Sequence, residues 1–163
     1  MNSGTAPRAI LVVRTDRLGE TLLNLPVLST LKGAFPQARV IWLVNEALVE
    51  LLRDAPGVDD VVGYPSQPPG SPWWQAAWRL ARRLHRERFD LAVLSNPKKE
   101  FHVACWLAGI PQRVGYDRKW GRLLTSRIPD HKALGEQHEI EYNLQLLKVL
   151  GIEVRAPVLQ LPV

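Results

Sequence analysis

The stretch that most constrains this chain is residues 9–28, where an apolar run is followed by a glycine-containing turn and then by leucines at helical spacing. The run Ile10–Val13 is bounded by charge, which is typical of a buried parallel strand. The apolar positions between residues 22 and 31 predict a helix. In an open α/β sheet, such a turn lies at the carboxyl end of a strand, where ligands bind and a new helix presents free N–H groups. We therefore expect the chemistry of the chain at residues 14–20.

The rest of the chain continues this alternation of strand and helix. Further strands are expected at residues 38–44, 58–64, 90–94 and 113–116, and further helices at 46–53, 73–88, 100–108 and 138–150. Alternating strands and helices predict an α/β fold, a doubly wound parallel sheet of about five strands with helices on both faces. Pro26 should kink the first helix or mark a late start. Residues 117–127 are predicted to form a basic loop.

The length of 163 residues suffices for one α/β domain and is too short for two. We expect a flexible N-terminus at residues 1–8, the domain at residues 9–153 and an extended, proline-containing tail at 154–163. No apolar run approaches the roughly 20 residues of a membrane span, and residues 1–8 lack a signal-peptide core. Cys105 is the single cysteine, so no internal disulfide can form. A cytoplasmic protein is the expectation.

The formal charge of +5 favours anionic partners, namely phosphorylated substrates, acidic lipid surfaces or nucleic acid. We expect no nucleic acid, because basic and aromatic residues are not interleaved on one surface. The helix expected at residues 73–88 carries four arginines and three tryptophans. Its basic face is explained most simply as a solvated surface, and peripheral contact with anionic headgroups of the inner membrane is the hypothesis set beside it. The residues concerned are Arg79, Arg82, Arg83, Arg86, Trp73, Trp74 and Trp78.

Sequence motifs for metals and nucleotide cofactors are missing. The four histidines and the cysteine lack HExxH-type or CxxC-type spacing, so we predict no metal site. The first turn has neither GxGxxG nor GxxxxGK[ST], so neither a dinucleotide site nor a P-loop is predicted. We therefore expect no cofactor.

Several stretches, in their order and spacing, resemble glycosyltransferase family 9, whose best-known members are ADP-heptose:lipopolysaccharide heptosyltransferases. The stretches are Arg14–Glu20 with the later Leu25 and Pro26, then Ala108–Tyr116, and finally Tyr142–Ile152. Together they extend from about residue 9 to the C-terminus.

The resemblance implies a GT-B architecture, in which two Rossmann-like domains face a cleft. The N-terminal domain of the family holds the acceptor, a Kdo or heptose sugar of the lipopolysaccharide core, and the C-terminal domain holds the ADP-sugar donor. This chain resembles only the N-terminal domain, and the tail at residues 154–163 corresponds to the start of the interdomain connection. The expected activity is thus one half of an inverting transfer of heptose or a related sugar, with little turnover unless a donor-binding half is supplied.

Glu20 is the candidate catalytic base, because an inverting transfer needs a carboxylate to take the proton of the acceptor hydroxyl. The family usually has Asp directly after the turn glycine, so glutamate is a departure that moves the carboxylate outward by one methylene. Asp16 is the alternative base. Without the resemblance, Glu20 would be explained as a first-turn acid that the helix dipole favours, and Asp16 as a turn-forming residue. Gly19 is expected to permit close backbone approach or a positive φ.

Polar and basic residues around this turn are the candidate acceptor contacts. Carboxylates and phosphates on a lipopolysaccharide core would suit arginine and lysine side chains. Each basic residue taken singly is explained better by a solvated surface charge than by a ligand contact, whereas for the group both explanations stay open. The candidates are Thr15, Arg17, Gly19, Lys98, Lys99, Arg118, Lys119 and Arg122, with Arg113 beside them.

A second function remains open from the residues alone. The chain could be a non-catalytic module that recognises an anionic glycolipid or membrane surface. A Glu20→Gln change, tested together with a complementing C-terminal half, would separate the enzyme from the module.

Overall fold

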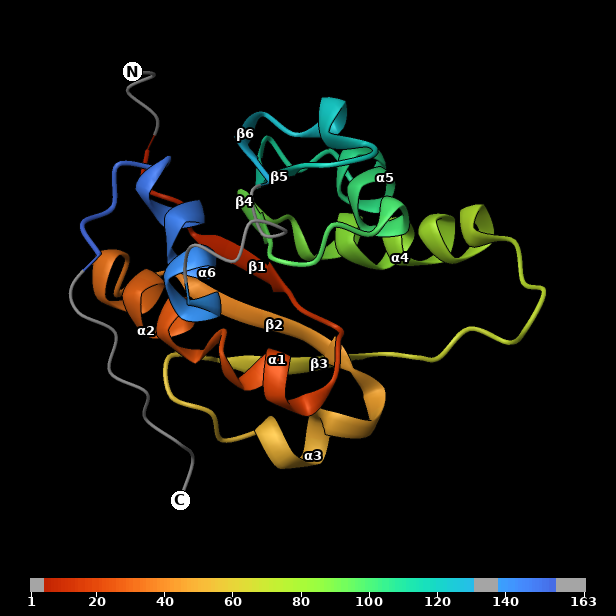
Figure 1. Cartoon of the computed structure of the whole chain (residues 1–163), viewed down its shortest axis with the longest axis horizontal. Coiled ribbons are helices and arrows are strands. Elements are labelled where there is room, and N and C mark those ends of the chain that lie inside the picture. The colour runs from red at the N-terminus through yellow and green to blue at the C-terminus, as the bar shows by residue number, and fades with distance from the viewer. Residues whose placement is uncertain (1–4, 131–137, 155–163) are drawn as a thin grey trace.

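The computed structural model describes residues 5–130 and 138–154. The predicted flexible N-terminus lies in part, and the predicted tail almost wholly, outside the described residues. The described chain forms an α/β fold with a six-stranded, entirely parallel sheet in the order β3-β2-β1-β4-β5-β6 (Figure 1). The strands are β1 (Ala9–Val13), β2 (Arg39–Asn45), β3 (Asp60–Tyr64), β4 (Leu91–Leu94), β5 (Gln112–Asp117) and β6 (Ser126–Pro129). The predicted fold class is confirmed.

The sheet has one strand more than the five that we expected. β6 begins within the segment predicted as a basic loop, and it pairs with β5 at the edge of the sheet. Its four residues alternate between half-buried and exposed, and it ends in Pro129. A short edge strand that ends in proline carries no apolar run, which explains why sequence periodicity missed it.

The helices agree with the expected ones except near Pro26 and in the predicted basic loop, which contains a 3₁₀ turn. One predicted helix is two, α1 (Leu18–Leu22) and α2 (Leu25–Ala34), and Pro26 lies in the first turn of α2. Proline is tolerated there because a first-turn N–H has no partner within the helix. The others are the 3₁₀ turn η1 (Glu46–Leu48), α3 (Val49–Leu52), α4 (Trp73–Glu87), α5 (Lys99–Leu107), η2 (Gly121–Leu123) and α6 (Glu139–Lys148). None of the helices in the described ranges is both long and apolar enough to cross a membrane.

Helices cover both faces of the sheet, as alternating side chains of the strands require. In β1, Ile10 and Val12 belong to the core formed with α2 and α6, whereas Leu11 and Val13 belong to the core formed with α4 and α5. Figure 1 shows α2 and α6 on one side of the strands and α4 and α5 on the other. All four side chains are almost fully buried, which explains the unbroken apolar run.

The strand order fixes where a site can form. The chain leaves β1 toward α2 and β2 on one face, and it leaves β4 toward α5 and β5 on the other. The carboxyl ends of β1 and β4, which lie side by side with Val13 opposite Leu94, are therefore the switch point of the sheet. Ligands of open α/β sheets bind outside such a point.

Candidate functional site

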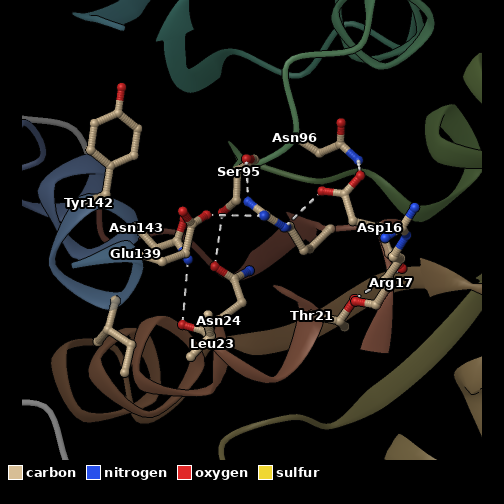
Figure 2. A network of polar contacts seen from close by, with 12 residues as sticks. Asp16, Arg17, Thr21, Leu23, Asn24, Ser95, Asn96, Glu139, Tyr142 and Asn143 are labelled. Carbon is tan, nitrogen blue, oxygen red and sulfur yellow. Dashed lines mark hydrogen bonds and ion pairs between the residues drawn. The ribbon is translucent and has the colours of Figure 1, made fainter. Parts of the chain in front are cut away.

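A buried arginine joins the segments that follow β1 and β4. The side chain of Arg14, directly after β1, is only 3% exposed. Its Nη1 donates to the carbonyl oxygen of Ser95 at 2.8 Å, its Nε lies 3.0 Å from Asp16 Oδ2, and its Nη2 lies 3.1 Å from Glu139 Oε1. One cation thus fixes the exit of β1, the exit of β4 and the start of α6 relative to one another. Figure 2 shows Ser95, Asp16 and Glu139 converging from these three segments.

Asn96 extends this network to the polar turn. Its Nδ2 donates to Thr15 Oγ1 at 3.0 Å and to Asp16 Oδ1 at 3.1 Å. Both oxygens of Asp16 are therefore engaged, one by Asn96 and the other by Arg14. Thr15 is buried and its Oγ1 accepts this hydrogen bond, so its contact with a sugar acceptor stays a prediction.

The buried side of the network reaches the first helices. Ser95 Oγ donates to Asn24 Oδ1 at 3.0 Å, and Asn143 of α6 donates to the carbonyl oxygen of Leu23 at 3.4 Å. These bonds fix the break between α1 and α2. The Nδ2 of Asn24 is buried without a hydrogen-bond partner among the described residues.

Stacked tyrosines hold α6 against the sheet. The rings of Tyr116 in β5 and Tyr142 in α6 lie 4.3 Å apart at 13°. The hydroxyl of Tyr116 donates to the carbonyl oxygen of Tyr142, and burial raises the pKa of Tyr116. This packing places the start of α6, and with it Glu139, beside Arg14.

Glu20 lies in the first turn of α1 with an exposed side chain. It makes no hydrogen bond or ion pair within the described parts of the chain. Thr21, next to it, is buried and donates to the carbonyl oxygen of Arg17 at 2.9 Å, which holds the start of the helix. Arg17 is the N-cap residue and is exposed, so its side chain remains available to a ligand.

Of the two expectations for Gly19, the positive φ was wrong, whereas close backbone approach stays a prediction. It lies within α1, its φ is not positive, and a Cβ placed on it would meet nothing within 4 Å. The fold of the described chain therefore does not require glycine at this position.

Lys98 and Lys99 follow β4, as predicted, and begin α5. Lys98 is the exposed N-cap residue, whereas the Nζ of Lys99 lies 4.7 Å from the centroid of the Trp73 ring. Trp73 in turn packs against Trp120 with ring centroids 5.7 Å apart. Lys99 is thus already engaged in a cation–π contact.

The other predicted basic residues lie after β5. Arg118 is 3.5 Å from Asp130 Oδ2, Lys119 adopts a left-handed φ of 52°, and Arg122 is exposed on η2. Arg113 is half-buried, and its Nε donates to the carbonyl oxygen of Leu123 at 2.6 Å, which is a structural contact. Within the described residues, no hydrogen bond or ion pair connects these side chains to the turn after β1.

Sequence reasoning named Thr15 and Asp16 of this network but missed its other members, among them Arg14, Asn96 and Glu139. Arg14 and Asn96 stood in the predicted turns, but their partners are far along the chain: Glu139 is separated from Arg14 by 125 residues. Their positions in the sequence could have indicated this network, because polar residues that directly follow two adjacent central strands meet at the same edge of the sheet. In the described ranges, no group of three or more histidine, cysteine or acidic side chains is placed to hold a metal ion.

Comparison with known proteins supports the resemblance to glycosyltransferase family 9. No family model matches the chain. It is 26% identical over 143 residues to lipopolysaccharide heptosyltransferase 3 of Escherichia coli, covering 82% of this chain and 40% of that protein. The structure resembles a family 9 glycosyltransferase of Veillonella parvula with a TM-score of 0.79 and 18% identity, covering 92% of this chain and 43% of the other. For heptosyltransferase II of E. coli the TM-score is 0.73 with 22% identity, covering 95% and 46%.

The chain spans less than half the length of the curated relatives that it matches, between 40% and 48%. The similarity therefore covers one half of each relative. The predicted resemblance and the predicted fold are both confirmed by these comparisons.

Proposed function

Because its relatives are heptosyltransferases, we propose that this chain is the acceptor-binding half of a family 9 glycosyltransferase. The reaction is an inverting transfer of heptose, or a related sugar, from an ADP-sugar to a sugar of the lipopolysaccharide core. Curated relatives named lipopolysaccharide heptosyltransferase support the acceptor, and solved heptosyltransferases with ADP and with an ADP-fluoroheptose, which this chain resembles with TM-scores of 0.68 and 0.69, support the donor. The donor would be held by a second half, which corresponds to the part of the relatives that this chain does not match.

The observation that carries this proposal is an exposed carboxylate beside the switch point of a heptosyltransferase-like fold. In the reaction, the acceptor hydroxyl attacks the anomeric carbon while the bond from that carbon to the ADP oxygen breaks. The hydroxyl proton passes to a carboxylate and ADP leaves. Glu20 is exposed in the first turn of α1 and has an open carboxylate, which suits it as the base.

The network explains why Asp16 is the weaker candidate. Each of its oxygens has one polar contact, to Asn96 Nδ2 at 3.1 Å and to Arg14 Nε at 3.0 Å. Its side chain is 26% exposed and is held among these partners, so it presents less open carboxylate to an acceptor than the exposed Glu20 does. We assign Asp16 a positioning role: it holds the turn rigid, so that Glu20 is presented in a fixed direction.

Arg17 and Lys98 are the acceptor contacts that the geometry favours most. They are the N-cap residues of α1 and α5, the helices that follow β1 and β4, and both are exposed. An anionic group on the acceptor would meet their charges at the carboxyl edge of the sheet. Arg118 already pairs with Asp130, while Lys119 and Arg122 stand farther along the chain on the β5 side.

The proposal is tested by comparing the chain alone with the chain joined to the donor-side half of a related heptosyltransferase. ADP release from ADP-heptose is measured with and without a Kdo-containing core oligosaccharide. We expect acceptor-dependent release from the joined protein and almost none from the chain alone. Turnover by the chain alone at the rate of a two-domain relative would overturn the proposal.

The same experiment addresses the non-catalytic module. A joined protein that is folded and binds both ADP-sugar and acceptor, yet releases no ADP, would favour binding without chemistry. Acceptor-dependent release that is lost in Glu20→Gln, with acceptor binding unchanged, would favour the enzyme.

A further inference from the structure

The outer face of α4 combines exposed indole rings with arginines. The inner side of the helix packs against the sheet and α5 through small and aliphatic residues. On the opposite side, Trp74 and Trp78 are 58% and 56% exposed, and Arg82 and Arg86 are exposed as well. These four residues recur every four positions and so form one row along the helix. We call this row the α4 face.

The arginines of the α4 face lack partners within the protein. Arg82 and Arg86 make no hydrogen bond or ion pair with any other residue that the structure describes. Their neighbours differ, because Arg79 donates to Gln67 Oε1 at 3.0 Å and Arg83 donates to the carbonyl oxygen of Gly63 at 3.3 Å. Arg79 and Arg83 thus bind the loop before α4 and strand β3, whereas Arg82 and Arg86 are exposed to solvent.

No acid neutralises the α4 face from its own helix. The single acidic residue of α4 is Glu87, whose Oε2 lies 2.8 Å from Arg39 Nη1 at the edge of the sheet. The α4 face therefore presents uncompensated positive charge beside two large aromatic surfaces. A two-fold contact between two copies would place these charges against each other, which disfavours a second copy as the occupant.

Two further apolar residues are exposed on the neighbouring helix. Trp106 and Leu107, in the last turn of α5, are 52% and 41% exposed. His85 Nδ1 lies 3.1 Å from the carbonyl oxygen of Ala108, which joins the end of α4 to the end of α5. Figure 1 shows α4 and α5 together on the side of the sheet away from α2 and α6. Both helices of this layer, α4 and α5, thus carry exposed tryptophan.

We propose that the α4 face binds an anionic lipid surface. Indole rings partition into the headgroup region, where their apolar body meets the acyl boundary and their N–H meets water. Arginine guanidinium groups pair with lipid phosphates, and each such charge near an anionic surface strengthens binding about fivefold. Single-stranded nucleic acid is bound by rings and charges interleaved along the strand, whereas here the two indoles occupy the first half of the row and the two arginines the second half. This inference does not depend on glycosyl transfer.

The test is sedimentation of the full chain with vesicles. Vesicles of phosphatidylcholine with 30% phosphatidylglycerol should bind the chain, and vesicles of phosphatidylcholine alone should not. In Arg82→Gln/Arg86→Gln, binding should weaken about 25-fold. The matched control is Arg53→Gln/Arg127→Gln, which removes the same charge from arginines paired with Glu50 and Asp117 elsewhere on the surface. It should retain most of the binding.

A second variant separates specific contact from general attraction. Brominated acyl chains should quench tryptophan fluorescence of the wild-type chain, and Trp74→Ala/Trp78→Ala should lose most of that quenching while keeping its far-ultraviolet circular dichroism. Equal losses in the control pair and the α4 pair, or quenching unchanged without Trp74 and Trp78, would overturn the proposal. So would binding to oligonucleotides but not to vesicles, or concentration-dependent dimerisation that Arg82→Gln/Arg86→Gln strengthens.

Discussion

Replacing Arg14 by methionine tests the network at the switch point. Methionine keeps the volume of the aliphatic stem and removes the guanidinium. That group contacts the carbonyl oxygen of Ser95 at 2.8 Å, Asp16 at 3.0 Å and Glu139 at 3.1 Å while its side chain is 3% exposed. The change therefore removes the cation that lies between two carboxylates and leaves a buried carbonyl oxygen without this donor.

The cost follows from these contacts. Removing one partner of a buried charge pair costs about 3–5 kcal/mol, and losing the donor of a buried acceptor costs about 1–3 kcal/mol. The side chains of Asp16 and Glu139 are 26% and 19% exposed, so water screens part of their repulsion. We therefore take the lower end and expect about 3 kcal/mol, a large part of the 5–15 kcal/mol that stabilises a typical domain.

Urea unfolding, followed by tryptophan fluorescence, measures this loss. For a slope near 2 kcal/mol per molar, the midpoint should fall by about 1.5 M. Arg53→Gln is the control: its pair with Glu50 is largely exposed, so stability should change by less than about 0.5 kcal/mol. If Arg14→Met does not fold, Arg14→Lys keeps the charge without the planar fork and should lie between it and wild type. A loss below 1 kcal/mol for Arg14→Met would refute the reasoning.

Three further predictions concern single residues. Gly19→Ala should unfold at the same or a slightly higher urea concentration than wild type, because the added Cβ meets nothing within 4 Å and alanine favours helix; a clear loss would contradict the placement of Gly19 in α1. Burial raises the pKa of the Cys105 thiol to about 12, so Ellman's reagent should react only after unfolding, and rapid reaction of the native chain would contradict this. Burial lowers the pKa of His102, so the unfolded chain takes up its proton first as pH falls below about 6.5; stability should decrease between pH 7 and pH 5, and His102→Gln should remove that part of the decrease.

The strands at the centre of the sheet were predictable because both of their faces are covered. The runs that became β1, β2 and β4 are apolar without a break, which reports burial between two helix layers. β6 was not predictable in this way, because it lies at the edge and alternates between half-buried and exposed residues. For the first helix, Pro26 predicted either a kink or a late start, and the sequence did not decide between these two alternatives.

The place of the site was predictable, whereas its internal contacts were not. The strand, turn and helix pattern of residues 9–28 predicted a turn at the carboxyl end of β1, whereas its position at the switch point became known only with the strand order. The roles within it depend on pairings such as Arg14 with Glu139 and Asn96 with Asp16, which join positions 125 and 80 residues apart. Local spacing contains no information about such pairs, so Asp16 looked as open as Glu20 until the fold brought Asn96 and Arg14 beside it.

The most direct test of the account is the turnover number of Glu20→Gln in the chain joined to a donor-side half, measured at saturating acceptor. Glutamine keeps the size of the side chain and cannot accept the proton, so turnover should fall by about 10²–10⁴-fold while the KM for the acceptor changes little. Glu20→Asp, which restores a carboxylate one methylene shorter, should recover part of the rate. Full turnover by Glu20→Gln, together with loss of turnover in Asp16→Asn at unchanged stability, would contradict the assignment of the base.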